Sequence, residues 1–201
     1  MKLFYKPGAC SMASHIALLE IGQAFDIEAV DTVAARTASG QDFLKINPKG
    51  YVPALELGTG EILTEGPAIL QFLADSSDTA NLAPKPGTMA RARMLEMLTF
   101  TSSELHKAFG PLFRDSSSPE ENAKARQAVA QKFDTVEKEF EDGRPFVSGE
   151  QFSIADAYLF VVANWANFTD IDLTRWPKLS EFVARIAERP SVKDAFQREG
   201  F

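Results

Sequence analysis

The only cysteine of the chain lies where a helix is expected to begin. In YKPGACSMASHIALLEIG, residues 5–22, a Pro-Gly turn signal precedes apolar positions such as Met12 and Ile16 that recur at helical spacing. The backbone N–H groups and the dipole at a helix start favour a thiolate and lower its pKa. We therefore expect Cys10 to be a reactive thiol. The alternative is that it is a small buried hydrophobic residue, as lone cysteines often are.

Two further segments carry groups that can bind a peptide or a carboxylate. In GYVPAL, residues 50–55, a proline at the start of a strand leaves the backbone of Val52 unpaired, and an unpaired peptide edge can bind another peptide. In TEGP, residues 64–67, an acid precedes a glycine N-cap and a proline at the first helical position, so that free N–H groups point outward. Each motif taken alone is more often structural than functional.

Composition excludes several classes of partner. The chain has 201 residues, 45% of them hydrophobic and 24% charged, with a net charge of -7. It has no run of Lys or Arg longer than two, so neither a nucleic acid nor an anionic membrane is an expected partner. A single cysteine cannot form an internal disulfide, and the first apolar run is too short for a signal peptide. The longest apolar stretch, residues 157–166, is shorter than the roughly 20 residues of a membrane span. These features favour the reducing cytoplasm.

Short strand and helix patterns alternate over the first part of the chain. The patterns predict strands at 3–5, 25–30, 52–57 and 61–64, and helices from 10 or 11 to about 21, at 41–47 and from 66 to about 74. The last two strands are joined by Gly58-Thr59-Gly60 and read as a hairpin. The order βαβαββα predicts a small mixed sheet of four strands.

The remainder of the chain reads as helical. Residues 78–88 are polar with two prolines and predict a linker, after which helices are expected at about 89–110, 119–141, 154–168, 178–188 and from 191 onward. The predicted fold class is therefore α/β plus all-α. It comprises an N-terminal domain over 1–77, a linker over 78–88 and a helical domain over 89–201.

A helix-starting motif and the two histidines complete the candidates. Ser153 and Asp156 have the spacing of a capping box, which is a folding element without a role in the chemistry. His15 lies in the first helix with no acid placed to orient it in the local sequence, and we assign it a structural role. With two histidines 91 positions apart and one cysteine, no metal-ligand spacing exists, so no metal site is expected.

Taken together, these segments resemble one enzyme family. The segments KLFYKPGACSMASHIALLE, NPKGYVPAL, LTEGPAILQFLAD, SELHK at 103–107 and FSIADAYLF at 152–160 look like those of bacterial beta-class glutathione S-transferases. The resemblance covers essentially the whole chain. It implies a thioredoxin-like N-terminal domain followed by a helical domain, glutathione as co-substrate and a homodimer.

The resemblance also implies roles for individual residues. It implies a cis Val52-Pro53 bond, with the Val52 backbone pairing with the cysteinyl residue of glutathione. Glu65 and Gly66 are implied to hold the γ-glutamyl end, where Glu65 or Glu104 takes the ammonium group. Across the helical domain, His106 and Lys107 are implied to approach the sulfur and the glycine carboxylate, and Ser103 and Glu104 to reach the glutathione of a neighbouring subunit.

The chain departs from the family pattern at three positions. Arg36 stands close to where the family often has a lysine, near position 35, that meets the glycine carboxylate of glutathione, and Arg36 is the expected substitute. Thr99 replaces a common asparagine, and Gly66 replaces a common serine but keeps its backbone N–H. The electrophile is expected in an apolar cleft. Its candidate residues, for which a core role is the alternative, are Phe109, Leu112, Phe113 and Phe168.

The sequence thus predicts an enzyme that activates the glutathione thiolate for attack on small hydrophobic electrophiles, in the sense of detoxification. One alternative is a glutathione-dependent monothiol reductase or peroxidase, in which Cys10 forms a mixed disulfide with glutathione; Ala13 stands where a second cysteine of a C-x-x-C pair would be. Another is a non-catalytic ligand-binding protein on the same fold.

Overall fold

The computed structural model describes residues 1–77 and 80–201 and divides them into two compact units. The first unit comprises Met1–Ala83 together with Glu188–Phe201, and the second comprises Pro84–Ala187. Residues 78 and 79 of the predicted linker lie outside the described residues. The predicted helical domain over 89–201 differs from this division at its end, because the last segment groups with the N-terminal part of the chain.

The first unit contains a mixed sheet whose strand order is β3-β2-β1-β4-β5. The strands are β1 (Lys2–Tyr5), β2 (Asp26–Asp31), β3 (Arg36–Thr37), β4 (Ala54–Glu56) and β5 (Ile62–Thr64). β1 and β2 are parallel, whereas the other neighbours are antiparallel. The prediction of four strands was wrong by one, because β3 adds a fifth. Its two residues pair with Val30 and Asp31, and so short a strand has no periodicity that a sequence can reveal.

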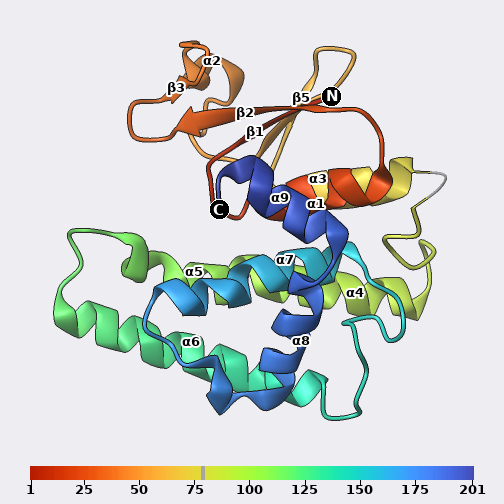
Figure 1. The fold of residues 1–201 in the computed structure, drawn as a ribbon, viewed down its shortest axis with the longest axis vertical. Helices are drawn as coiled ribbons and strands as arrows, with labels where there is room; N and C mark the ends of the chain where they lie inside the picture. Colours follow the sequence, from red (N-terminus) through yellow and green to blue (C-terminus); the bar gives the residue numbers. More distant parts are fainter. Residues whose placement is uncertain (78–79) are drawn as a thin grey trace. The chain divides into compact units, whose positions relative to one another are not determined.

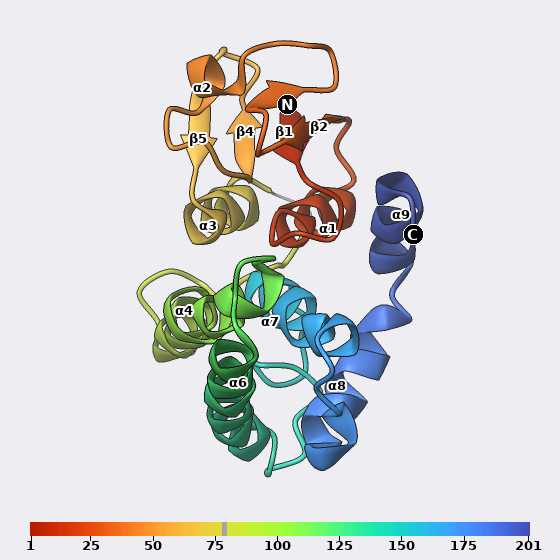
Figure 2. The same ribbon diagram turned by 90° about the vertical axis from the view of Figure 1, so that its left-hand side faces the viewer.

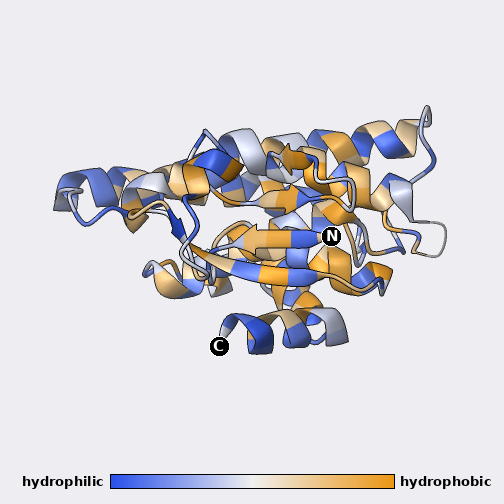
Figure 3. Cartoon of the chain, turned by 90° about the horizontal axis from the view of Figure 1, so that it is seen from above, coloured by the Kyte–Doolittle hydropathy of each residue, from blue (hydrophilic) through white to orange (hydrophobic). Residues whose placement is uncertain are grey.

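Helices cover both faces of this sheet. α1 (Met12–Ile21) and α3 (Gly66–Ser76) lie on one face and the short α2 (Phe43–Ile46) lies on the other, as Figure 1 and Figure 2 show. The last helix, α9 (Pro190–Glu199), packs beside α1. Hydrophilic and hydrophobic residues are interspersed along α9 (Figure 3), as expected for a helix with one buried side.

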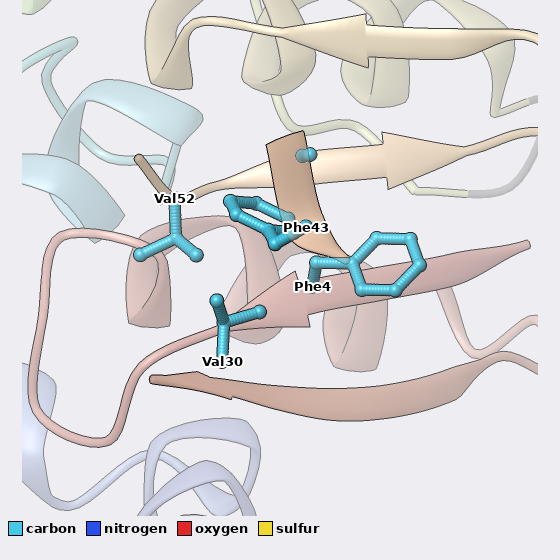
Figure 4. Close-up of a cluster of buried hydrophobic side chains, with 5 residues drawn as sticks. Phe4, Val30, Phe43 and Val52 are labelled. Carbon is cyan, nitrogen blue, oxygen red and sulfur yellow. The ribbon is translucent and has the colours of Figure 1, made fainter. Parts of the chain in front are cut away.

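Side chains of β1 are buried on both faces of the sheet. Successive residues of a strand point to opposite faces, so Leu3 and Phe4 enter different cores, and both are buried. Phe4 meets Phe43 of α2, with ring centroids 6.0 Å apart. Val30 and Val52 join this cluster (Figure 4), so the side chain of Val52 is fixed in the core while its backbone lies just before the start of β4.

The second unit is helical. Its elements are α4 (Met89–Phe100), a π-helical turn (Thr101–Leu105), α5 (His106–Phe109), a 3₁₀ turn (Gly110–Phe113), α6 (Pro119–Glu139), α7 (Ile154–Asn164), 3₁₀ turns at Trp165–Phe168 and Leu173–Arg175, and α8 (Pro177–Ala187). α4 and α8 both pack against α7 (Figure 2), whose residues from Ile154 to Ala163 are all buried.

Two predicted helices of this unit are less regular than expected. The helix predicted over 89–110 is α-helical only to Phe100 and then widens into the π-helical turn. The helix predicted over 154–168 tightens into a 3₁₀ turn after Asn164. Among the described residues, no helix combines the length and the apolar character needed to cross a membrane.

Candidate functional site

Cys10 lies in the loop between β1 and α1, which we call the thiol loop (residues 6–11). Ser11 closes this loop, because its hydroxyl accepts the N–H of Lys6 at 3.2 Å and donates to the carbonyl of Lys6 at 3.3 Å. The predicted helix begins at Met12, slightly later than expected, with Ser11 as its N-cap. The half-buried Cys10 directs its sulfur toward the carbonyl oxygen of Val52, 3.7 Å away. The structure therefore joins the thiol to the start of β4.

The backbone of Val52 is the second part of this arrangement. The Val52-Pro53 peptide bond is cis, as the family resemblance implied. Among the described residues, no group accepts a hydrogen bond from the N–H of Val52. A peptide that runs alongside can therefore pair with this N–H and with the adjacent carbonyl.

Glu65 and Gly66 form the start of α3, shifted by one position from the prediction. Glu65, not Gly66, is the N-cap residue, and Gly66 is the first helical residue with Pro67 behind it. Glu65 has a φ of 74°, which lies in the left-handed region that residues other than glycine rarely adopt. Glu65 is also exposed. Strain of this kind is concentrated at binding sites.

The carboxylate of Glu65 is held by two residues that the sequence reading did not assign. Lys49 Nζ donates to Glu65 Oε1 at 2.7 Å and to Thr64 Oγ1 at 3.1 Å, and the hydroxyl of Tyr51 donates to the same carboxylate oxygen at 2.8 Å. Hydrogen bonding to Glu65 raises the pKa of both Lys49 and Tyr51. Both residues lie in NPKGYVP, just before the cis proline, and this position is the one feature of the sequence that could have pointed to them as site residues.

Among the described residues, Arg36 makes no contact with Glu65, Lys49 or Tyr51. Its guanidinium donates to the carbonyl of Gly40 at 3.1 Å, and its backbone pairs with Asp31 in the sheet. Lys49 is thus the cation that the first unit holds beside Glu65, and the expected role of Arg36 at the glycine carboxylate stays a prediction.

His106 of the second unit lies in an aromatic surrounding. Its Nδ1 is 2.8 Å from the hydroxyl of Tyr158, and its ring centroid is 4.9 Å from that of Trp165. Burial and, to a smaller extent, the charge of Lys107 lower the pKa of His106 to about 4. The imidazole is therefore neutral at pH 7, with one ring nitrogen a hydrogen-bond donor and the other an acceptor.

The other predicted polar residues of the second unit lie in the π-helical turn and in the helices next to it. Ser103 donates to the carbonyl of Thr99 at 2.9 Å, and Glu104 pairs with Lys132 at 2.7 Å. Thr99, Ser103, Glu104 and Lys107 are all exposed. Wide turns of this type are frequent at functional sites because they offset side chains from the regular helix.

The four apolar candidates divide into core and surface. Phe109 is fully buried, with its ring centroid 5.6 Å from that of Trp165 and 6.1 Å from that of Phe133, so it is a core residue of the second unit. Phe113 and Phe168 are more than half exposed, and Leu112 is half-buried. Only these last three have apolar surface to offer to a ligand.

Two residues that were assigned structural roles are buried and hydrogen-bonded. Asp156 accepts the N–H of Ser153 at 2.8 Å, its hydroxyl at 2.6 Å and the N–H of Val147 at 2.6 Å, which confirms the capping box. His15 has a partner that its local sequence did not reveal, because its Nδ1 is 2.9 Å from Glu199 Oε1 at the end of α9. Within the described residues, no group of three or more His, Cys, Asp or Glu side chains is placed to hold a metal ion.

Comparisons with known proteins agree with this arrangement. The family model for the glutathione S-transferase N-terminal domain matches residues 1–75, and that for the C-terminal domain matches residues 100–190. The chain is 44% identical over 200 residues to glutathione S-transferase GstA of Escherichia coli O157:H7, covering 100% of this chain and 99% of that protein. It is 34% identical over 207 residues to glutathione S-transferase GST-4.5 of Xanthomonas campestris, with 100% and 99% coverage.

Solved structures extend the comparison to the fold. The beta class glutathione S-transferase of Sphingomonas chungbukensis is 48% identical, with a TM-score of 0.95 and coverage of 100% of this chain and 99% of that one. A sphingomonad glutathione S-transferase complexed with glutathione is 45% identical, with a TM-score of 0.95 and full coverage of both chains. The bacterial protein BphK, solved as a ternary complex, is 46% identical, with a TM-score of 0.96 and full coverage of both.

Proposed function

The chain belongs to the glutathione S-transferase family, and from this membership we propose that it transfers glutathione to small electrophiles through a site built around the thiol loop, Val52 and Glu65. The observation that carries the proposal is the pairing of Cys10 with the open backbone of Val52, 3.7 Å apart, beside a strained, exposed acid. A sulfur-containing tripeptide matches these three groups.

Each part of glutathione has a counterpart in the first unit. The peptide groups of its cysteinyl residue would pair with the N–H and carbonyl of Val52, as strands pair at a sheet edge. The ammonium of its γ-glutamyl end would meet Glu65, whose partners Lys49 and Tyr51 fix the carboxylate in place. The free N–H groups of Gly66 and Ala68 at the start of α3 would receive the neighbouring carboxylate.

The reaction requires an ionised sulfur held against an electrophile. The glutathione thiol loses its proton, its sulfur forms a bond to the electrophilic carbon, and the leaving group departs with the electron pair of the broken bond. The proton passes to solvent, because a pKa of about 4 makes His106 too weak a base to hold it at pH 7, and we assign to the neutral imidazole of His106 a hydrogen bond to the sulfur. Leu112, Phe113 and Phe168 are the candidates for contact with the hydrophobic electrophile, and Phe109 supports them from the core.

We assign the remaining polar residues of the second unit to the ends of glutathione. Lys107 would meet the glycine carboxylate. In a homodimer, Thr99, Ser103 and Glu104 would reach the glutathione of the neighbouring subunit. Size-exclusion chromatography with light scattering tests the dimer, and a monomer at assay concentration would remove this part of the proposal. We place the protein in the cytoplasm, consistent with a chain whose single cysteine forms no internal disulfide.

A conjugation assay with glutathione and chlorodinitrobenzene tests the main proposal. We expect a saturable rate above the uncatalysed reaction and a strong rise in the KM for glutathione when Glu65 is replaced. A non-catalytic ligand-binding protein on this fold would bind glutathione without accelerating the reaction.

Thiol exchange is a second activity that a specific observation favours. Cys10 is the only cysteine, is half-buried and lies beside the proposed position of the glutathione sulfur. With glutathione disulfide, its thiolate would attack one sulfur, form a mixed disulfide and release one glutathione thiolate, so that no external oxidant is needed. Mass spectrometry under non-reducing conditions would detect the added glutathionyl group on Cys10. An unmodified mass after incubation with glutathione disulfide would exclude this second activity.

A further inference from the structure

The end of α9 contacts the thiol loop from the opposite end of the sequence. Glu199, the last residue of α9, has a fully buried side chain. Its Oε2 accepts the N–H of Gly8 at 3.0 Å, and its Oε1 lies 2.9 Å from Nδ1 of His15. Gly8 precedes Cys10 by two residues and His15 follows it within α1. One carboxylate therefore connects the two sides of the segment that carries the thiol.

The end of α9 makes a second contact with the thiol loop, through Phe201. Gly200 adopts a left-handed conformation with φ 90°, and the N–H of Phe201 turns back to the carbonyl of Phe196 at 3.0 Å. This is the Schellman type of helix ending, which usually brings together the two flanking apolar side chains. The rings of Phe196 and Phe201 do meet, with centroids 5.7 Å apart.

The ring of Phe201 thereby lies against Gly8. A Cβ atom added to Gly8 would be 2.9 Å from Cζ of Phe201, and the φ of Gly8 is 70°. A side chain at this position would be both strained and in collision with the ring. The loop conformation at Gly8 and the position of Phe201 are thus mutually dependent.

The contacts of His15 indicate that its Nδ1, which faces Glu199, carries a proton. His15 is fully buried, and within the described residues its Nε2 has no hydrogen-bond partner. A proton on that nitrogen would be a buried donor without an acceptor, which is costly. With the proton on Nδ1 instead, His15 donates to Glu199, and the carboxylate receives two N–H donors. Burial first, and then the charge of Glu199, raise the pKa of the neighbouring Tyr5.

We propose that Glu199 and Phe201 form a clamp on the thiol loop, and that these two residues together with His15 are positioning residues for Cys10. The clamp holds the loop in the conformation that directs the sulfur toward the carbonyl of Val52. The inference goes beyond the proposed function, because it concerns the placement of the thiol in the free protein. It holds whether or not glutathione is transferred.

Alkylation of Cys10 by iodoacetamide tests the clamp without glutathione. The chain has one cysteine, so the rate of alkylation reports on Cys10 alone. Replacing Glu199 by Leu removes both hydrogen-bond acceptors while roughly preserving the side-chain volume. We expect the alkylation rate at the alkaline plateau of its pH profile to rise by at least about fivefold, the effect of losing about 1 kcal/mol of restraint.

The plateau separates the clamp from a charge effect. Loss of a negative charge near a thiol changes the midpoint of the profile, whereas a loosened loop raises the plateau rate. Phe201→Ala changes no charge and should also raise the plateau. It also keeps the proposal testable if the Glu199→Leu variant does not fold. All rates are measured below the unfolding midpoint of each variant, as established by circular dichroism.

Two control variants distinguish positioning from general stability. Glu20 of α1 accepts two hydrogen bonds from Arg189 at 2.9 Å each, so Glu20→Leu also removes a carboxylate that joins α1 to this C-terminal segment, yet it leaves Gly8 and His15 untouched. We expect its plateau rate to match that of the wild type. Glu199→Gln keeps an acceptor for the N–H of Gly8 but can pair with His15 only when that ring carries its proton on the unpartnered Nε2, so we expect its plateau rate to lie between those of the wild type and Glu199→Leu.

Three results would overturn the clamp. The first is a wild-type plateau rate in both Glu199→Leu and Phe201→Ala. The second is an equal increase in Glu20→Leu, which would show that only the docking of α9 matters. The third is a Glu199→Gln variant whose plateau rate equals that of Glu199→Leu, which would show that the hydrogen bond from Gly8 to residue 199 does not restrain the loop. Because no step uses glutathione, a failed conjugation assay leaves these outcomes interpretable.

Discussion

At the scale of residues, the chemistry depends on which atoms face Cys10. The sequence placed Cys10 next to a helix start, and the motif GYVPAL pointed to the open backbone of Val52; the structure brings both together. The thiol of Cys10 contacts the carbonyl of Val52, whereas the sequence had predicted only an influence of the N–H groups at the helix start. Glu199 was missed because it lies 191 positions from Gly8, and no local pattern encodes such a pairing.

Replacement of Cys10 by Ala separates the two proposed activities. We expect conjugation to fall by less than about tenfold, or about 1.4 kcal/mol in the barrier, because the bound glutathione supplies its own sulfur. Disulfide exchange should be lost entirely, because the attacking thiolate is gone. Parallel assays with chlorodinitrobenzene and with glutathione disulfide measure both. An equal loss of the two activities would contradict this division.

Replacement of Glu65 by Gln tests the contact with the ammonium group. A hydrogen bond to a charged group contributes about 1.5–3 kcal/mol, so we expect the KM for glutathione to rise by roughly 10- to 150-fold with little change in kcat. Glu61→Gln is the matched control, because Glu61 is an exposed acid of the adjacent hairpin that contacts Thr59. Similar KM values for the two variants would remove Glu65 from the site.

At the scale of elements, features encoded locally were predicted and those that depend on packing were not. The capping box at Ser153 was predicted from side chains three residues apart and is present, and the structure has a second capping box at Ser118. The π-helical turn Thr101–Leu105 was not predicted, because the apolar spacing of α and π turns differs too little over five residues. It shapes the segment that contains Ser103 and Glu104.

Asp156, the acid of the capping box of α7, should contribute more to the free energy of unfolding than Ser118, the N-cap residue of α6. Asp156 is fully buried and accepts three hydrogen bonds, so Asp156→Ala leaves buried donors unpaired. We expect a loss of about 2–4 kcal/mol in the free energy of unfolding, against about 1 kcal/mol for Ser118→Ala at the exposed cap of α6. Urea denaturation measures both, and activity per folded molecule should be unchanged. A stable Asp156→Ala variant without activity would contradict a purely structural role.

The charge of Asp156 should also make stability depend on pH. Burial raises the pKa of Asp156 to about 6, although hydrogen bonds from Ser153 and Val147 act to lower it. The folded state therefore binds this proton more tightly than the unfolded state does. The stabilisation is complete below about pH 4 and is lost as the pH rises through about 6.

The comparison with Asp156→Asn isolates this contribution. Between pH 4 and pH 7, the wild type should lose on the order of 2–3 kcal/mol relative to the variant, which cannot ionise at this position. Denaturation at several pH values gives the difference. A difference that does not vary with pH would show that Asp156 has the same ionisation in both states.

At the scale of the whole molecule, the sequence predicted the class of fold and the order of its elements. Local periodicity, the hairpin glycines and the caps determined most of that order, and the family resemblance is confirmed over the full length. The assignment of the last segment to the first unit was not predictable. It depends on contacts such as Arg189 with Glu20 and Glu199 with His15, which span 169 and 184 positions.

Calorimetric titration of the purified protein with glutathione tests the central claim most directly, namely that the first unit presents a binding site for this tripeptide. The account predicts a saturable isotherm with a dissociation constant at or below the millimolar range, and binding weakened at least about tenfold by Glu65→Gln but not by Glu61→Gln. Absence of saturable heat at millimolar glutathione, with the protein folded, would contradict it.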